Sequence, residues 1–380
     1  MNLPPLSLYI HLPWCVQKCP YCDFNSHTLE SNRQDFNSYI DALAADFADQ
    51  YQPLGERPIN TIFIGGGTPS LLPGAAVERL LSTIRRHAPL AENIEITLEA
   101  NPGAIDAGHF YDYRLSGINR LSIGIQSFDN QALESLGRIH DHDQAITAYL
   151  SAQSAGFDRI NLDLMFGLPN QSINGGLKDL QLAVELGPTH LSWYQLTLEP
   201  NTPFAHAPPS LPEEETIDEI HQIGIEYLEK RGLERYEISA FAAPDSQCRH
   251  NINYWRFGDY IGIGAGAHGK LTRTNGEILR TRNERGPERY LAAPKQFADT
   301  QILGLTDLPF EFMMNALRLK SGVHPSLFQQ RTGLALGYIS KPLETAVSRG
   351  LLETSNERIV ATDLGFRFLN DLIGMFLYEQ

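Results

Sequence analysis

Cys15-Val16-Gln17-Lys18-Cys19-Pro20-Tyr21-Cys22 is the most informative stretch of this 380-residue sequence. It holds three of the chain's 4 cysteines, and only Cys248 lies elsewhere. Thiolates this close together repel one another unless a cation binds them. The C-x3-C-x2-C spacing supplies three soft ligands, whereas an iron–sulfur cubane held by protein alone takes four. The spacing therefore predicts a metal site with one open coordination position.

Two other interpretations of the cysteines remain open from the spacing alone. A zinc ion would need a fourth ligand, which His11 or His27 could supply. A disulfide would need an oxidising compartment and would leave one thiol unpaired. Residues 1–5 have neither the basic nor the apolar region of a signal peptide, so we expect a cytoplasmic protein.

The composition is that of an ordinary soluble globular protein, with 42% hydrophobic and 20% charged residues and no run of about 18 apolar residues. Lys and Arg number 30 against 45 Asp and Glu, so the net charge of −15 opposes binding to phosphate backbones or anionic lipid. The densest basic stretch, residues 273–289, is interrupted by three glutamates and is typical of a solvated face. We therefore expect no nucleic-acid partner and no transmembrane segment.

Short β-rich runs alternate with amphipathic stretches of helical period over the first 230 residues. The predicted strands are Ser7–His11, Thr61–Ile64, Ile94–Leu98, Leu121–Ile125, Ile160–Leu164 and Leu191–Leu196. The clearest predicted helices are Phe36–Gln50, Ala75–His87, Gln144–Ala155 and Leu177–Glu185. Such alternation predicts parallel strands joined by crossover helices. Six units are too few for a closed eight-stranded barrel and favour a partial one, with an open doubly wound sheet as the alternative.

Polar and glycine residues gather where these strands end. Gly65-Gly66-Gly67-Thr68-Pro69 follows the second strand, Glu99 and Gln126 follow the third and fourth, and Asp163 lies in the fifth. The carboxyl ends of barrel strands share one face, where barrel enzymes place their active sites. Each of these residues taken singly could instead cap a helix or form a tight turn. Together they predict a ligand site beside the cysteine loop.

From Pro309 onward the pattern changes to helices followed by a hairpin. The predicted elements are Phe310–Leu319, Leu327–Thr332, Lys341–Arg349, the hairpin Leu351–Thr362 and a last helix from Asp363. This order resembles a winged helix. Residues 338–349 stand where a recognition helix would be, but Lys341 and Arg349 are their only basic residues. We therefore expect a protein-contact or lid role rather than DNA binding.

The residues around the cysteines resemble a known signature. Tyr9-Ile10-His11-Leu12-Pro13-Trp14 precedes C-x3-C-x2-C, Tyr21 precedes the last cysteine, and GGGTP follows at 65–69, as in radical S-adenosylmethionine enzymes. More closely, the chain resembles the oxygen-independent coproporphyrinogen III dehydrogenase family from about Leu6 through its carboxy-terminal region. The resemblance implies an α/β fold: a partial, TIM-like (β/α)6 barrel over residues 1–230, an extension and connector over 231–305, and a smaller, mostly helical, winged-helix-like domain over 306–380.

The same resemblance implies which residues bind cofactors. Cys15, Cys19 and Cys22 would hold a [4Fe–4S] cluster, and the amino and carboxylate groups of S-adenosylmethionine would occupy its open iron. The other residues expected to bind S-adenosylmethionine are Tyr9, Tyr21, Gly66, Gly67, Thr68, Glu99, Gln126, Arg138, Asp163 and His268. Charge agrees, because Arg138 suits a carboxylate while Glu99 or Asp163 suits paired ribose hydroxyls. His268 ends the glycine-rich stretch Ile261–His268, whose spacing departs from a dinucleotide fingerprint.

Two features depart from the dehydrogenases. That family carries another cysteine two positions after the third ligand, where this chain has Phe24, and a longer amino-terminal extension. His250-Asn251-Ile252-Asn253-Tyr254 instead resembles the H-N-x-x-Y motif of a sister family, the heme chaperones of the HemW type. This resemblance implies heme binding through His250, Asn251 and Tyr254, with His250 the preferred iron ligand and Cys248 the next.

We therefore expect a heme chaperone that binds heme and passes it to acceptor proteins, carrying a [4Fe–4S] cluster and S-adenosylmethionine and served by an electron donor. The first alternative is a coproporphyrinogen III dehydrogenase-type radical enzyme. The second is a cluster-bearing interaction or redox-sensing protein. Whether the chain is an enzyme stays open at this point.

Overall fold

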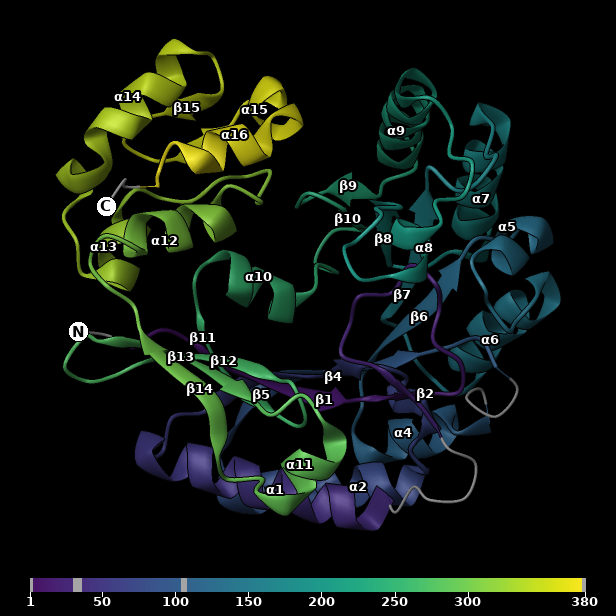
Figure 1. Ribbon diagram of the computed structural model, residues 1–380, viewed down its shortest axis with the longest axis horizontal. Helices are drawn as coiled ribbons and strands as arrows, with labels where there is room; N and C mark the ends of the chain where they lie inside the picture. The colour runs from purple at the N-terminus through teal and green to yellow at the C-terminus, as the bar shows by residue number, and fades with distance from the viewer. Residues whose placement is uncertain (1–2, 30–35, 104–107, 378–380) are drawn as a thin grey trace.

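One curved sheet organises the fold. The computed structural model describes residues 3–29, 36–103 and 108–377, and within them twelve strands form this sheet. Its centre holds six parallel strands in chain order: β1 (Leu6–Leu12), β4 (Ile59–Gly66), β5 (Leu90–Ala100), β6 (Arg120–Gln126), β7 (Ile160–Phe166) and β8 (His190–Gln195). A doubly wound sheet would reverse its strand order partway. The unbroken order confirms the predicted six-unit partial barrel (Figure 1).

Residues 231–305 extend the sheet at both edges. At one edge β11 (Asp259–Ile263) pairs in parallel with β1, and β12 (His268–Thr272), β13 (Ile278–Asn283) and β14 (Phe297–Ile302) follow it antiparallel. At the other edge β10 (Ala240–Ala242) and β9 (Glu234–Arg235) continue from β8. The chain between the two edges passes the inner side of the sheet as helix α10 (Arg249–Trp255), near the centre of Figure 1.

Helices cover the outer face of the sheet. They are α1 (Phe36–Tyr51), α2 (Gly74–His87), α4 (Phe110–Ser116), α6 (His142–Ser154), α7 (Ile173–Leu186), α9 (Glu214–Glu229) and α11 (Pro287–Ala292). Two short helices, α5 (Asn130–Ser135) and α8 (Pro203–His206), pack instead near Tyr21 of the cysteine segment, beyond the carboxyl ends of the strands. Shorter elements are η1 (Gln52–Leu54), η2 (Pro69–Leu71) and the paired strands β2 (Trp14–Cys15) and β3 (His27–Thr28). The four predicted helices of this region are confirmed as α1, α2, α6 and α7, the last beginning four residues earlier than predicted.

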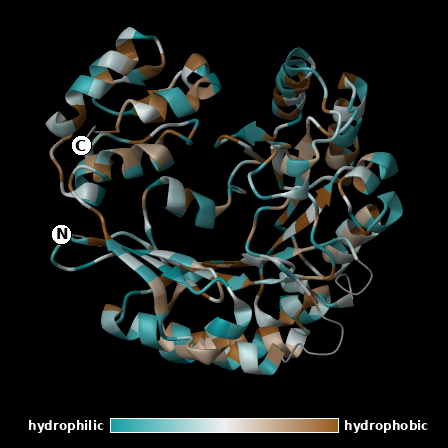
Figure 2. Cartoon of the chain, viewed as in Figure 1, coloured by the Kyte–Doolittle hydropathy of each residue, from teal (hydrophilic) through white to brown (hydrophobic). Residues whose placement is uncertain are grey.

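The two faces of the barrel strands differ in chemistry. In β1, for example, Leu8 and Ile10 are fully buried in the main hydrophobic core, while Ser7, Tyr9 and His11 alternate with them. Figure 2 shows brown, hydrophobic stretches along the strands where they meet the outer helices. Because side chains in a strand point alternately to opposite faces, the inner face is lined by polar groups. That lining is what gives the barrel interior a capacity to bind ligands.

The carboxy-terminal part packs as a second core. It contains α12 (Leu308–Ala316), α13 (Ser326–Thr332), η3 (Leu336–Ile339), α14 (Ser340–Ser348), β15 (Leu352–Thr354), β16 (Ile359–Ala361), α15 (Asp363–Arg367) and α16 (Leu369–Gly374). Three helices and a hairpin follow one another as predicted, but Phe257 and Ile278 of the barrel extension belong to the same core. The division at residues 230 and 305 stays a proposal.

No helix within the described residues is long and apolar enough to cross a membrane.

Candidate functional site

The cysteine loop lies at the carboxyl end of β1. Cys15 ends β2, which pairs with β3, so the start and the end of the loop lie side by side. Backbone hydrogen bonds fix it: among them, Leu29 N–H donates to Cys15 O at 2.9 Å and Cys22 N–H donates to Cys19 O at 3.1 Å. All three thiols are free and half-buried. They are therefore accessible to a cofactor.

Cations hold and surround this loop. Lys18 Nζ donates to Phe24 O at 3.2 Å and to Ser26 O at 3.1 Å, which closes the loop around the third cysteine. Arg138 Nη1 lies 3.7 Å from Cys19 Sγ. Burial raises the pKa of Cys15 and Cys22, so without a bound cation these thiols resist ionisation. The positive charges favour thiolate, and the loop fits an anionic cluster.

The zinc interpretation gains no support at His11. Its Nδ1 lies 2.9 Å from Tyr9 Oη and its Nε2 lies 2.9 Å from Asn25 O, so both ring nitrogens have partners within the protein. Within residues 3–29, 36–103 and 108–377, no group of three or more His, Cys, Asp or Glu side chains converges on a single ion. A cubane needs no such convergence, because each thiolate binds a different iron.

The glycine loop after β4 lies directly against the cysteine loop. Gly67 N–H donates to Leu12 O at 2.6 Å and Thr68 N–H donates to Trp14 O at 2.7 Å. A Cβ atom on Gly67 would lie 2.4 Å from Trp14 O, a backbone atom that cannot move aside. Gly66 has a φ of +120°, outside the range of ordinary residues. The glycines are thus required for the close approach of these two loops.

A polar chain joins this glycine loop to the cysteine loop. Thr68 Oγ1 accepts from Asn101 Nδ2 at 2.9 Å, and Asn101 Oδ1 accepts from Arg138 Nη2 at 2.8 Å. The same Nη2 donates to Gly124 O at 2.8 Å, while the buried Nε of Arg138 has no partner within the described residues. Sequence reasoning did not assign Asn101 to the site. Its position directly after the Glu99-Ala100 strand end was the available signal.

Two acidic residues face the interior just below. Glu99 Oε2 accepts from Gly66 N–H at 3.1 Å, and burial together with the nearby Asp163 raises the pKa of Glu99 to about 8. Asp163 accepts from Ser122 Oγ at 3.0 Å and from Asn161 Nδ2 at 2.8 Å, and burial raises its pKa as well. Buried carboxyl groups of this kind suit a ligand that brings amine or hydroxyl donors.

The remaining residues predicted to bind S-adenosylmethionine lie around this edge. Gln126 takes a left-handed φ of +69° at the end of β6, and its Oε1 accepts from Tyr194 Oη at 2.8 Å. Tyr9 stacks on Phe63 with ring centroids 6.3 Å apart, and Tyr21 packs against Phe204 at the same centroid distance. His268 is exposed at the start of β12. The structure brings these groups to one end of the barrel, but their roles in binding stay predictions.

The H-N-x-x-Y motif forms α10 and packs on the opposite end of the same strands. His250 is only 1% exposed: its Nδ1 lies 2.8 Å from Thr61 Oγ1 and its Nε2 lies 2.8 Å from Tyr254 Oη. Asn253 Nδ2 donates to Ser7 Oγ at 2.9 Å. Ser7 and Thr61 lie in the amino-terminal halves of β1 and β4, whereas Cys15 and Gly66 follow or end those strands. Five residues of strand, about 16 Å, separate Thr61 from Gly66.

The residues in and beside this motif differ in their protonation and burial. Burial lowers the pKa of His250 to about 3, so its imidazole is neutral at pH 7. Burial raises the pKa of Cys248 to about 11, and its thiol, 3.7 Å from Glu95 Oε1, stays protonated. Asn251 is half-buried. Aromatic contacts link α10 to Tyr9, because Phe63 lies between the two: its ring is tilted against that of His250, with centroids 5.1 Å apart, and is stacked on that of Tyr9.

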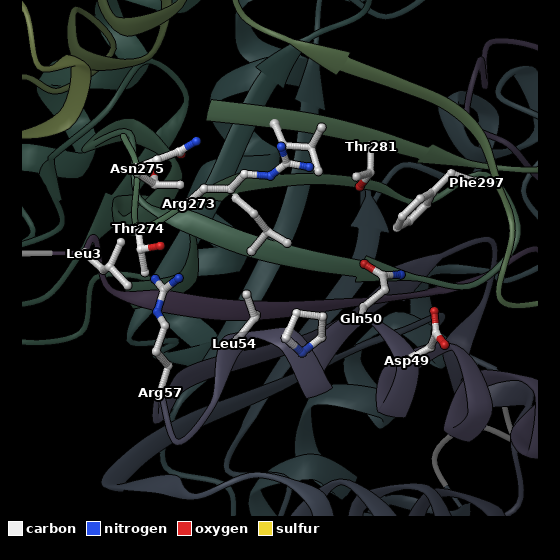
Figure 3. Close-up of a pocket in the computed structure, with 14 residues that line it drawn as sticks. Leu3, Asp49, Gln50, Leu54, Arg57, Arg273, Thr274, Asn275, Thr281 and Phe297 are labelled. Atoms are coloured by element: carbon white, nitrogen blue, oxygen red, sulfur yellow. The ribbon is translucent and has the colours of Figure 1, made fainter. Parts of the chain in front are cut away.

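A pocket of about 470 Å³ lies away from both sets of residues (Figure 3). Its walls come from the end of α1 and the segment after it, with Gln50 and Arg57, and from the β12–β13 hairpin and β14, with Arg273 and Phe297. Arg57 is paired with Asp259 at 2.9 Å and Arg273 with Glu277 at 3.0 Å. None of the residues predicted from the sequence to bind a cofactor or heme lines it.

Comparison with known families covers both parts of the chain. Residues 9–183 match the Radical SAM superfamily, and residues 303–368 match the HemN C-terminal domain. These ranges correspond to the barrel from β1 to α7 and to the second core from just before α12 to α15.

Among curated proteins, the Heme chaperone HemW of Escherichia coli (strain K12) is 48% identical over 100% of both chains. The Heme chaperone HemW of Bacillus subtilis (strain 168) is 35% identical over 98% of this chain and 99% of the relative. Among solved structures, coproporphyrinogen III oxidase (HemN) from Escherichia coli, a radical SAM enzyme, superposes with a TM-score of 0.82. That match covers 98% of this chain and 90% of the other at 24% identity, so it shows the fold alone.

Proposed function

Because this chain belongs to the heme chaperone HemW family, within the radical SAM superfamily, we propose that it binds heme and transfers it to acceptor proteins. The observation that carries the proposal is the 48% identity, over the full length of both chains, to the heme chaperone of Escherichia coli. We further propose that it acts in the cytoplasm and that an electron donor serves its cluster.

The cofactor part of the proposal assigns Cys15, Cys19 and Cys22 to a [4Fe–4S] cluster and the polar strand ends to S-adenosylmethionine. When bound, such a cluster can supply one electron to S-adenosylmethionine. Arg138 stabilises negative charge on Cys19, from 3.7 Å away. Glu99, with its pKa raised to about 8, gains most from a neighbour that donates hydrogen bonds or carries positive charge, which describes a ribose or an amine.

The heme part of the proposal assigns the iron to His250. Iron binding at Nε2 requires the tautomer whose Nδ1–H donates to Thr61 Oγ1, since a metal-bound imidazole keeps a second partner on its other nitrogen. An imidazole binds a metal ion in its neutral form, and the ring of His250 is already neutral at pH 7. Tyr254 Oη must leave Nε2 for iron to take its place. Heme binding at His250 therefore requires a movement of α10 or of Tyr254.

One observation favours the chaperone over a decarboxylating enzyme of the dehydrogenase type. At the position where the dehydrogenases resembled by this sequence carry a further cysteine, Phe24 is 64% exposed beside the cluster loop. A phenyl ring cannot ligate iron or donate a thiol hydrogen. Anaerobic incubation with coproporphyrinogen III, S-adenosylmethionine and a reductant distinguishes the two functions, because only the enzyme releases carbon dioxide.

The direct test is a heme titration of the anaerobically reconstituted protein with and without S-adenosylmethionine. We expect His250→Ala to weaken heme binding by at least about tenfold, since loss of even an outer partner of a metal ligand has that effect. His221→Ala is the matched control: burial also lowers the pKa of His221, but its ring packs on Phe166 and Trp193 of the barrel strands. If the parent and His250→Ala bind heme with equal affinity, His250 is not the iron ligand. A parent that binds no heme rejects the proposed function.

A further inference from the structure

Arg120 is a buried cation on the inner face of the barrel. It is the first residue of β6 and only 3% exposed. Ser122, two residues along the strand, bonds Asp163 on the inner face, so Arg120 points to the same side. The groups whose charges act on Arg120 are Cys248, Glu95, Tyr236 and Asp163, and in turn it acts on His190 and His250.

Nothing within the described residues pairs with this guanidinium. Glu95 is committed elsewhere: its Oε2 lies 2.9 Å from Arg159 Nη1, and its Oε1 accepts the His250 backbone N–H at 3.1 Å. Asp163 likewise accepts from Ser122 and Asn161. Arg120 donates no hydrogen bond to any described residue and forms no ion pair with one, although it has five N–H donors to satisfy. The surrounding groups raise the pKa of Arg120 and keep it charged, but its N–H donors are left for a ligand.

The surroundings indicate the class of ligand. A guanidinium presents two parallel N–H donors that match the two oxygens of a carboxylate. The nearby imidazole of His190 is held between Asn161 Oδ1, at 2.6 Å, and Tyr236 Oη, at 2.9 Å, so it does not compete with Arg120 for a carboxylate. One unpaired cation balances a singly charged carboxylate, whereas a phosphate dianion would leave excess negative charge beside Glu95 and Asp163.

We propose that Arg120 anchors a carboxylate of the ligand that enters the barrel interior. Resting on the proposed function, that carboxylate is a propionate of the heme whose iron binds His250. The iron ligand then comes from α10 and the carboxylate anchor from β6. Heme combines one metal with peripheral propionates, so it meets both groups at once.

The proposal is tested by comparing hemin with hemin dimethyl ester, whose propionates carry no charge. In the parent, hemin should bind more tightly than the ester by roughly 10- to 100-fold, the contribution typical of hydrogen bonds between charged groups. Arg120→Gln should weaken hemin by the same factor and leave the ester nearly unchanged, and Arg120→Lys should lie between. Equal losses for both ligands in Arg120→Gln, or a parent that does not distinguish them, overturn the assignment.

Arg159→Gln is the matched control, because Arg159 lies beside the same Glu95 but is already paired with it. It should change the affinities for hemin and for the ester by equal factors. If it abolishes the preference for hemin while Arg120→Gln does not, the anchor is Arg159 and the proposal fails.

A second measurement keeps the Arg120 site testable without heme. Millimolar propionate should raise the melting temperature of the parent by binding the folded state, and Arg120→Gln should lose that shift. If the parent binds neither porphyrin, the proposed function fails. The change in melting temperature with propionate then tests the carboxylate site at Arg120 independently. Equal shifts, or none in either protein, overturn it.

Discussion

Glu99 shows how one buried side chain makes stability depend on pH. Burial and Asp163 raise its pKa from 4.5 to about 8, so the folded protein keeps this proton to a higher pH than the unfolded chain does. The contribution of Glu99 to the free energy of unfolding therefore falls as pH rises from about 4.5 to about 8.

Replacing the carboxyl group removes this dependence. Relative to the parent without cofactors, Glu99→Gln should become progressively more stable between pH 5 and pH 8, as measured by urea unfolding at several pH values. The exposed Glu134→Gln should run parallel to the parent. A constant difference between Glu99→Gln and the parent across this range would show that Glu99 titrates as an ordinary carboxyl group.

Sequence reasoning identified the types of residue in the site better than their surroundings. The cysteine spacing, the glycines after β4 and the acids at the strand ends were all visible in the chain, because metal and ligand chemistry restricts which residue types can stand there. The burial of His250 between Thr61 and Tyr254 was not visible. It depends on where α10 packs, which is a tertiary property.

At the scale of the elements, the cysteine loop and the glycine loop depend on each other. Gly67→Ala would place a Cβ 2.4 Å from Trp14 O, so one of the two loops must shift. We expect this substitution to cost about 1–3 kcal/mol in the free energy of unfolding and to lower the iron bound after reconstitution. Gly337→Ala is the control, since a Cβ there meets nothing within 4 Å. Normal iron content and stability in Gly67→Ala would refute the close approach.

Elements with regular alternation were predicted and irregular ones were missed. The six strands from β1 to β8 had clear β-rich patterns, whereas β11 lies in the glycine-rich stretch, for which either a close approach to S-adenosylmethionine or a tight strand edge was expected. Gly262 and Gly264 serve close backbone contacts there: a Cβ on Gly262 would lie 1.9 Å from His268 O, and one on Gly264 would lie 2.3 Å from His11 O. Glycines that admit neighbouring backbone give no side-chain periodicity to detect.

At the scale of the whole molecule, the second core includes Phe257 and Ile278 of the barrel extension, so the barrel and the carboxy-terminal part should unfold together. Phe312 of α12 packs edge-on against Phe257 of the barrel extension, with ring centroids 5.8 Å apart, and against Phe328 at 5.4 Å. Phe312→Ala should cost about 3–5 kcal/mol and preserve a single unfolding transition.

Fluorescence and circular dichroism during urea unfolding check this expectation. Phe368→Ala, at a side chain 49% exposed, should have little effect. Two separated transitions in the Phe312→Ala variant would mean that the carboxy-terminal part unfolds independently of the barrel. A three-part division of the chain was predicted from the sequence and stays a proposal, but the place of Phe257 in the second core was not predicted, because it arises from a contact between distant segments.

The separation of the cysteine loop and α10 along β1 and β4 has a thermodynamic consequence. Heme at His250 and S-adenosylmethionine at the cluster would be two ligands of one molecule, connected through Tyr9, Phe63 and His250. Any factor by which S-adenosylmethionine changes heme affinity must then equal the factor by which heme changes S-adenosylmethionine affinity. The equilibrium occupancy of both sites is the same whichever ligand binds first. An ordered delivery of heme can therefore arise only from the rates of binding and release.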